Sequence, residues 1–192
     1  MVQTAKPPVT RAQYVALERA SATKHELVNG EILAMSGGSP AHSLIAANVT
    51  RLLGNLLVSG PCAVFNSDLR VVVQATGLTT YPDVTVVCGP RELHPEDDHA
   101  ITNPRVVLEV LSPTTEAYDR GAKFAHYQSV PSLEEYVLVA SVGRRIEHYR
   151  RQPTGQWLLT TYVADDASVE LPALGGSVRL GDVYAKVEEP AA

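Results

Sequence analysis

Two acidic residues that accompany apolar, strand-like segments carry the clearest chemical signal in this sequence. Asp83 precedes the run Val84–Val87, and Glu109 lies inside the run Val107–Leu111. A carboxylate inside an apolar strand is costly unless it is paired or bound to a metal. If the two runs are neighbouring strands, both acids can converge on one hard divalent cation, which is satisfied by two carboxylates, water and a substrate phosphate. We therefore expect a Mg²⁺ (or Mn²⁺) site at Asp83 and Glu109.

A lysine follows on the next expected helix. Asp119, Lys123 and Tyr127 recur at four-residue steps, so they share one helix face. Because phosphodiester hydrolysis needs a cation to stabilise the charge that develops on phosphorus, Lys123 is the third predicted catalytic residue. Asp119 and Tyr127 are secondary candidates that would orient it. The alternative is an ordinary surface ion pair between Asp119 and Lys123, worth only ~0.3–0.5 kcal/mol.

Two further residues are secondary site candidates. Glu26 lies on an expected hairpin strand, where a solvated edge acid is as consistent with the pattern as a third site carboxylate. His42 lies near an expected helix start and could contact a phosphate or a metal, although a lone histidine more often serves packing.

The N-terminal third of the sequence predicts a helix, a hairpin and a second helix. Thr10 and Gln13 have the spacing of a capping box. Asn29-Gly30 between His25–Val28 and Glu31–Ala34 predicts a two-residue hairpin turn. Ser39 and Pro40 then begin a helix that ends near Gly60.

The remaining sequence alternates between strands and one helical region. A helix is expected from Tyr118 to Ser129, and the polar segment from Gly89 to Pro104 is expected to be an exposed loop that frames a substrate cleft. The expected strands share β-branched and aromatic residues: Ala63–Phe65, Leu69–Gln74, Val84–Cys88, Val106–Leu111, Glu135–Ala140, Arg145–Arg150, Trp157–Tyr162 and Val169–Leu171.

Bulk composition predicts one globular domain over residues 1–192, because 45% of the 192 residues are apolar. We expect flexible tails at 1–9 and 187–192. The net charge of −5 argues against binding nucleic acid through a broad basic face.

Cys62 and Cys88 lack a C-x-x-C spacing, so we expect buried thiols and neither a disulfide nor a zinc site. The sequence shows no signal peptide and no membrane span, which predicts a cytoplasmic protein.

Several of these segments together resemble a known family. The string from Tyr81-Pro82-Asp83 through Glu109-Val110-Leu111-Ser112-Pro113, followed by Asp119, Lys123 and Tyr127, is similar to the Uma-two family of endonucleases within the PD-(D/E)xK, or restriction-endonuclease-like, superfamily. The early hairpin and the Ser36–Pro40 loop with His42 also match.

This resemblance implies an α/β (α+β) fold, with a mixed central sheet flanked by helices and an N-terminal helix and hairpin. It also implies that the metal-binding acids are Asp83 and Glu109 and that the lysine is Lys123. In the parent superfamily the lysine stands two residues after the glutamate, where this chain has Leu111. The helix residue Lys123 is expected to replace it.

The leading hypothesis is a magnesium-dependent phosphodiester hydrolase that acts as a DNA endonuclease and works as a homodimer. Two alternatives remain open at this point. One is a non-catalytic member that keeps the nuclease fold for binding or dimerisation. The other is a hydrolase of a small nucleotide, because the sequence lacks a basic segment interleaved with aromatic residues.

Overall fold

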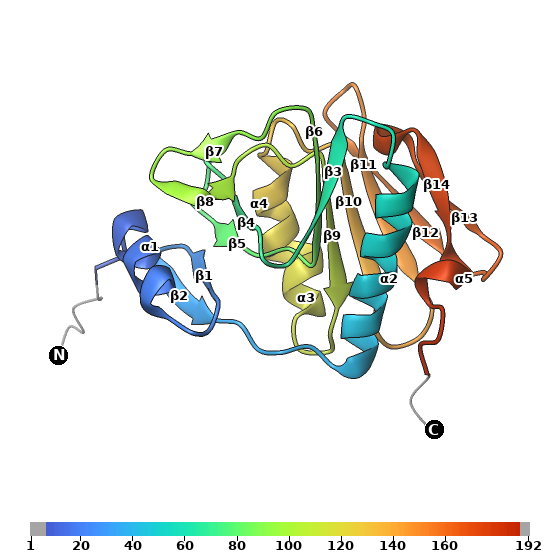
Figure 1. Cartoon of the computed structure of the whole chain (residues 1–192), viewed down its shortest axis with the longest axis horizontal. Coiled ribbons are helices and arrows are strands. Elements are labelled where there is room, and N and C mark those ends of the chain that lie inside the picture. The colour runs from blue at the N-terminus through green and yellow to red at the C-terminus, as the bar shows by residue number, and fades with distance from the viewer. Residues whose placement is uncertain (1–6, 189–192) are drawn as a thin grey trace.

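The computed structural model describes residues 7–188, and its N-terminal elements form one end of the molecule (Figure 1). Helix α1 (Arg11–Ala20) begins with the expected capping box between Thr10 and Gln13. Strands β1 (His25–Val28) and β2 (Glu31–Ala34) form the expected hairpin. Asn29 and Gly30 adopt φ angles of 50° and 81°, as a two-residue turn of this kind requires.

The expected tails fall mainly outside the described residues, which exclude 1–6 and 189–192. Val9 is described, and its N–H donates to the Gly30 carbonyl at 2.8 Å. Val187 packs against a buried apolar cluster, so the chain is still in contact with the core at this point.

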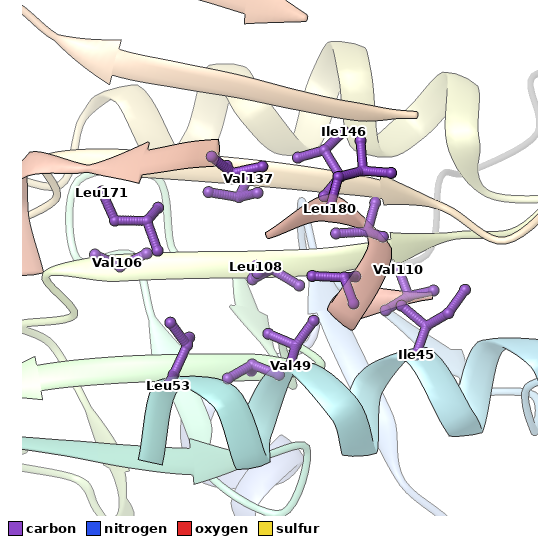
Figure 2. Close-up of a cluster of buried hydrophobic side chains, with 14 of the residues drawn as sticks. Ile45, Val49, Leu53, Val106, Leu108, Val110, Val137, Ile146, Leu171 and Leu180 are labelled. Atoms are coloured by element: carbon purple, nitrogen blue, oxygen red, sulfur yellow. The ribbon is translucent and has the colours of Figure 1, made fainter. Parts of the chain in front are cut away.

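Helix α2 (Pro40–Leu56) covers one face of the main sheet. The Ser39 side chain caps the helix by accepting from the His42 N–H, and Pro40 occupies the first turn, as the sequence predicts. Figure 2 shows that its apolar side chains point toward strand residues such as Leu108 and Val110. These α2 residues are Ile45, Val49 and Leu53.

The main sheet has six strands in the order β12-β11-β10-β9-β6-β3. β9 and β10 run parallel, whereas the other neighbours are antiparallel, so the sheet is mixed as expected. The strands are β3 (Cys62–Asn66), β6 (Val84–Cys88), β9 (Val106–Leu111), β10 (Glu135–Ala140), β11 (Ile146–Arg151) and β12 (Trp157–Tyr162).

Alternation along β9 decides which layer each side chain enters. Val106, Leu108 and Val110 join the apolar cluster around α2. Val107 and Leu111 join a second cluster, which contains Phe124 and Tyr127 from the opposite layer. Glu109 lies between Leu108 and Val110 in sequence and therefore faces this second layer.

The second layer contains the helical segment that follows β9. It comprises α3 (Glu116–Tyr118), a π-helical turn η1 (Asp119–Lys123) and α4 (Phe124–Gln128), where the sequence predicts one regular helix. The buried Tyr136 hydroxyl on β10 donates to the Asp119 carbonyl at 3.0 Å. This bond satisfies a main-chain acceptor within the π-helical turn.

A second six-stranded sheet, ordered β2-β1-β5-β4-β8-β7, joins the hairpin to the middle of the chain. It adds β4 (Arg70–Val72), β5 (Thr79–Thr80), β7 (Leu93–His94) and β8 (Asp97–Ile101). The prediction of an exposed loop from Gly89 to Pro104 is therefore wrong, because β8 pairs in parallel with β4. The segment also does not frame the cleft, since none of its residues lines the site pocket. Asp97 can be buried there because Arg70 lies 2.8 Å away.

The two cysteines also differ from the expectation of free, buried thiols. Cys62 and Cys88 are direct partners in the antiparallel register of β3 and β6, and they form a disulfide. The strand register brings them together across 26 positions of sequence, a relationship that local spacing does not encode.

The C-terminal region packs against α2 and the main sheet and lies at the end of the molecule opposite α1 (Figure 1). It contains β13 (Ser168–Leu171), a 3-10 turn η2 (Pro172–Leu174), β14 (Gly176–Arg179) and α5 (Leu180–Val183). Across residues 7–188, no helix has both the length and the apolar character needed to cross a membrane.

Candidate active site

The pairing of β6 with β9 brings Asp83 and Glu109 together at one end of the main sheet. Val84 pairs with Leu108 in an antiparallel register, so the preceding residue Asp83 falls opposite Glu109. The Val110 N–H donates to Asp83 Oδ2 at 2.7 Å, and the Asp83 N–H lies 3.4 Å from Glu109 Oε2. Each carboxylate is thus held by the other residue's strand.

Lys123 reaches this acid pair from the π-helical turn. Its Nζ lies 2.9 Å from Glu109 Oε1, 3.3 Å from Glu26 Oε1 and 3.5 Å from Asp119 Oδ1. The Lys123 and Asp119 side chains are 7% and 6% exposed, so the two do not form an ordinary surface ion pair. The helix therefore delivers the ammonium group to the buried acid on the strand.

Glu26 and Tyr127 also belong to this cluster. The Tyr127 hydroxyl donates to Glu109 Oε1 at 3.2 Å. Glu26 accepts a hydrogen bond from the Thr80 hydroxyl and contacts Lys123, so it is not a solvated edge acid. Thr80 was not predicted from the sequence, because β5 is only two residues long and its pairing depends on β1 and β4.

His42 approaches Asp83 from the first turn of α2. Its Nε2 lies 3.3 Å from Asp83 Oδ2. The neighbouring Gly38 fits tightly, since a Cβ at that position would lie 2.6 Å from His42 Nδ1. The glycine-containing loop before α2 therefore packs directly against the imidazole.

A pocket of about 500 Å³ opens over these groups. It is walled by the loop from Met35 to Ser39, by the turn from Ser112 to Thr115 and by Tyr118, whose ring centroid is 6.0 Å from Lys123 Nζ. Tyr118 is a further site residue that the sequence did not single out. The pocket contains all the predicted polar site residues except Tyr127: Glu26, His42, Asp83, Glu109, Asp119 and Lys123.

Burial and crowding of acids set the electrostatics of the pocket. Burial raises the pKa of Glu109 to about 8, against the opposing effect of the Lys123 ammonium. Burial likewise raises the pKa of Asp119. Burial alone would lower the pKa of Lys123, but the surrounding carboxylates of Glu109, Glu26 and Asp119 outweigh it and hold that pKa well above its usual value.

The donor chemistry of this pocket fits a hard divalent cation. Four carboxyl groups, from Glu26, Asp83, Glu109 and Asp119, line the pocket beside one lysine, so acidic groups outnumber this cation. Within residues 7–188, no group of three or more His, Cys, Asp or Glu side chains forms a ready-made metal cage. Asp83 and Glu109 suit Mg²⁺ nonetheless, because this ion keeps several waters and commonly takes only one or two protein carboxylates.

A mixed sheet flanked by helices, with paired acids and a lysine in a pocket at one sheet end, places the protein in the restriction-endonuclease-like class. The chain belongs to the Uma2 family, described as "Putative restriction endonuclease", whose model matches residues 11–181.

Relatives and a solved structure extend this comparison. The chain is 40% identical to the uncharacterized protein slr1290 of Synechocystis sp., covering 93% of this chain and 92% of that relative. It is 32% identical to the uncharacterized protein sll1609 of the same organism, covering 88% and 96% of the two chains. A crystal structure described as a putative nuclease belonging to DUF820, from Anabaena variabilis, shares the fold with a TM-score of 0.72, 18% identity and coverage of 88% and 93%.

Proposed function

We propose that the protein is a magnesium-dependent (or manganese-dependent) phosphodiester hydrolase that acts as a DNA endonuclease. The observation that carries the proposal is the convergence of Asp83, Glu109 and Lys123 in one pocket, from three separate elements of the chain. A paired acid site beside a buried ammonium matches the needs of phosphodiester hydrolysis, which are a metal, a held water and stabilisation of negative charge.

Each residue has a distinct role in this proposal. Asp83 and Glu109 would hold the metal, whose chemistry when bound is to lower the pKa of water and to polarise the phosphoryl group. Lys123 Nζ would stabilise negative charge as it grows on the phosphate. Tyr127 donates to Glu109 and Asp119 contacts Lys123, so both position the groups that act.

The surrounding residues complete the pocket. Glu26 gives Lys123 a second carboxylate partner and so keeps its ammonium protonated. His42 contacts Asp83 and restrains that side chain at the pocket wall.

A homodimer and a cytoplasmic location remain predictions, and light scattering of purified protein tests the first.

Two other functions remain distinguishable from this one. A non-catalytic binding or dimerisation protein would not need the buried Lys123, whose desolvation is costly without a functional return. A small-nucleotide hydrolase is compatible with the limited pocket volume of about 500 Å³.

The test is cleavage of supercoiled plasmid, single-stranded DNA, RNA and a cyclic dinucleotide by purified protein with Mg²⁺ or Mn²⁺, in parallel with EDTA. We expect metal-dependent cutting of DNA. Turnover of the cyclic dinucleotide alone would favour the small-nucleotide alternative, and no turnover of any substrate would favour the non-catalytic one.

A further inference from the structure

A second open groove lies away from the acid pocket, between α4 and the strands β11 and β12. Its volume is about 700 Å³. Its lining is aromatic and amide-rich and includes no Asp or Glu: Phe124, Gln128, Tyr149, Gln152, Gly155, Gln156, Trp157 and Leu158. The chain has a net charge of −5, and four acidic residues line its site pocket. The groove has no acidic lining residue, so its lining does not repel a polyanion.

The aromatic wall of the groove is fixed in place. The Phe124 ring lies 4.5 Å from Tyr149 and 5.3 Å from Trp157 between centroids. The Arg151 guanidinium lies 4.8 Å from the Trp157 centroid and donates to the carbonyls of Gln128 and Val130 at 2.8 Å each. Trp157 and Tyr149 nevertheless remain partly exposed, and both line the groove.

The amides of the groove add hydrogen-bonding capacity beside these rings. Gln128 and Gln156 are exposed, and Gln152 is half-buried. A glutamine amide offers both donors and an acceptor, which complement the polar edge of a nucleobase. Flat rings, neutral amides and a flanking guanidinium together are the chemistry that binds an unpaired base by stacking.

The groove is connected to the acid site through α4 and its aromatic neighbours. Tyr127, which donates to Glu109, lies 5.2 Å from Tyr136, and Tyr136 lies 5.2 Å from Phe124 in the groove wall. Lys123 immediately precedes Phe124 at the start of the same helix. The groove and the acid pocket therefore share the helical segment around Lys123 and Phe124, with the buried rings of Tyr127 and Tyr136 between them.

We propose that this groove binds an unpaired base of single-stranded DNA, next to the segment that is cut. The choice of ligand rests on the proposed nuclease function. A base must be unpaired to enter because, in a duplex, its ring faces are covered by the stacked neighbours. The groove thus assigns a substrate class to the enzyme: DNA with a single-stranded segment, in preference to a continuous duplex.

The chain supplies its own reporter for this test, because Trp157 is its one tryptophan. Intrinsic fluorescence is titrated with a 15-nucleotide single-stranded DNA in EDTA, where no metal-dependent cutting occurs. We expect saturable quenching by the single strand, and weaker binding to the matching duplex. Gln156→Ala and Gln128→Ala should each weaken binding about three- to tenfold, as the loss of one hydrogen bond implies.

Two controls separate this proposal from general adhesion and from the cleavage chemistry. Gln74→Ala, at an exposed glutamine outside the groove, should leave binding unchanged. Asp83→Asn should retain the quenching, so the groove can be confirmed even if the chain proves unable to cut DNA. The proposal is overturned by an absence of quenching, by equal effects of the groove variants and Gln74→Ala, or by binding of duplex DNA as tight as that of single-stranded DNA.

Discussion

Lys123 contacts Glu109 from the helical segment after β9, with 2.9 Å between Nζ and Oε1. In the parent superfamily the lysine would stand at the position of Leu111, two residues after Glu109. Leu111 here is 3% exposed and packs in the same apolar cluster as Phe124 and Tyr127. Leu111 thus contributes an apolar side chain to the core, and the ammonium group comes instead from Lys123 on the π-helical turn.

Replacing Lys123 tests its proposed role in stabilising charge. Lys123→Met keeps most of the side-chain volume but removes the ammonium, so the cleavage rate should fall ~10²–10³-fold while metal binding persists. Single-turnover cleavage measures the rate. Arg120→Met is the matched control, because Arg120 lies on the same turn but pairs with Glu116 and Glu147 instead of the site acids. Equal, small losses in both variants would remove Lys123 from catalysis.

Removing either predicted metal ligand should weaken cation binding. Asp83→Asn and Glu109→Gln each remove one carboxylate, so we expect Mn²⁺ affinity to fall at least tenfold while the far-ultraviolet circular dichroism stays unchanged. Calorimetric titration gives the affinity. Glu116→Gln, which changes an acid outside the pocket, is the control. Affinities that match the unmodified protein would place the metal elsewhere.

The metal-free protein should lose stability as the pH rises. Burial raises the pKa of Glu109 from 4.5 to about 8, so between these values the folded state binds more protons than the unfolded state. The free energy of unfolding should therefore decrease across this window, by up to about 1.4 kcal/mol per pH unit for one proton.

Glu109→Gln isolates this contribution, because the raised pKa values of His42 and Asp119 act in the same direction and remain in the variant. Urea unfolding in EDTA at pH 5 to 8 should give a flatter profile for Glu109→Gln. Parallel profiles for the two proteins would show that Glu109 does not titrate in this range.

The Cys62–Cys88 disulfide should stabilise the fold without entering the reaction. It joins β3 to β6 across 26 positions, for which the loop-entropy relation gives about 3.5 kcal/mol. A Cys62→Ser/Cys88→Ser double variant should therefore unfold at lower urea concentration but cut DNA at an unchanged rate. A large loss of cleavage under folding conditions would instead link β6, and hence Asp83, to the redox state of the pair.

Local sequence patterns could predict the elements whose determinants lie close together in the chain. Asn29-Gly30 specifies its own turn, and a carboxylate at Glu109 within an apolar strand points to the candidate site because burying it requires a partner. Strand β8 cannot be predicted locally, because an aspartate such as Asp97 is typical of a loop. Its burial in a strand depends on the ion pair with Arg70, which lies 27 positions earlier in the sequence.

Other features depend on register and on irregular backbone. The disulfide follows from the pairing of β3 with β6, and Thr80 reaches Glu26 only through the sheet that joins β5 to β1. The π-helical turn at Asp119–Lys123 has no distinct sequence period, so a regular helix was the expected form.

The most direct test of the account is the rate of DNA cleavage by the unmodified protein and by Asp83→Asn, measured side by side with Mg²⁺ or Mn²⁺ and with EDTA. The account predicts cutting by the unmodified protein that requires the metal, and a loss of at least ~10²-fold in the folded variant. Equal cutting by the two proteins, or cutting that persists in EDTA, would contradict a metal-dependent nuclease site at Asp83 and Glu109.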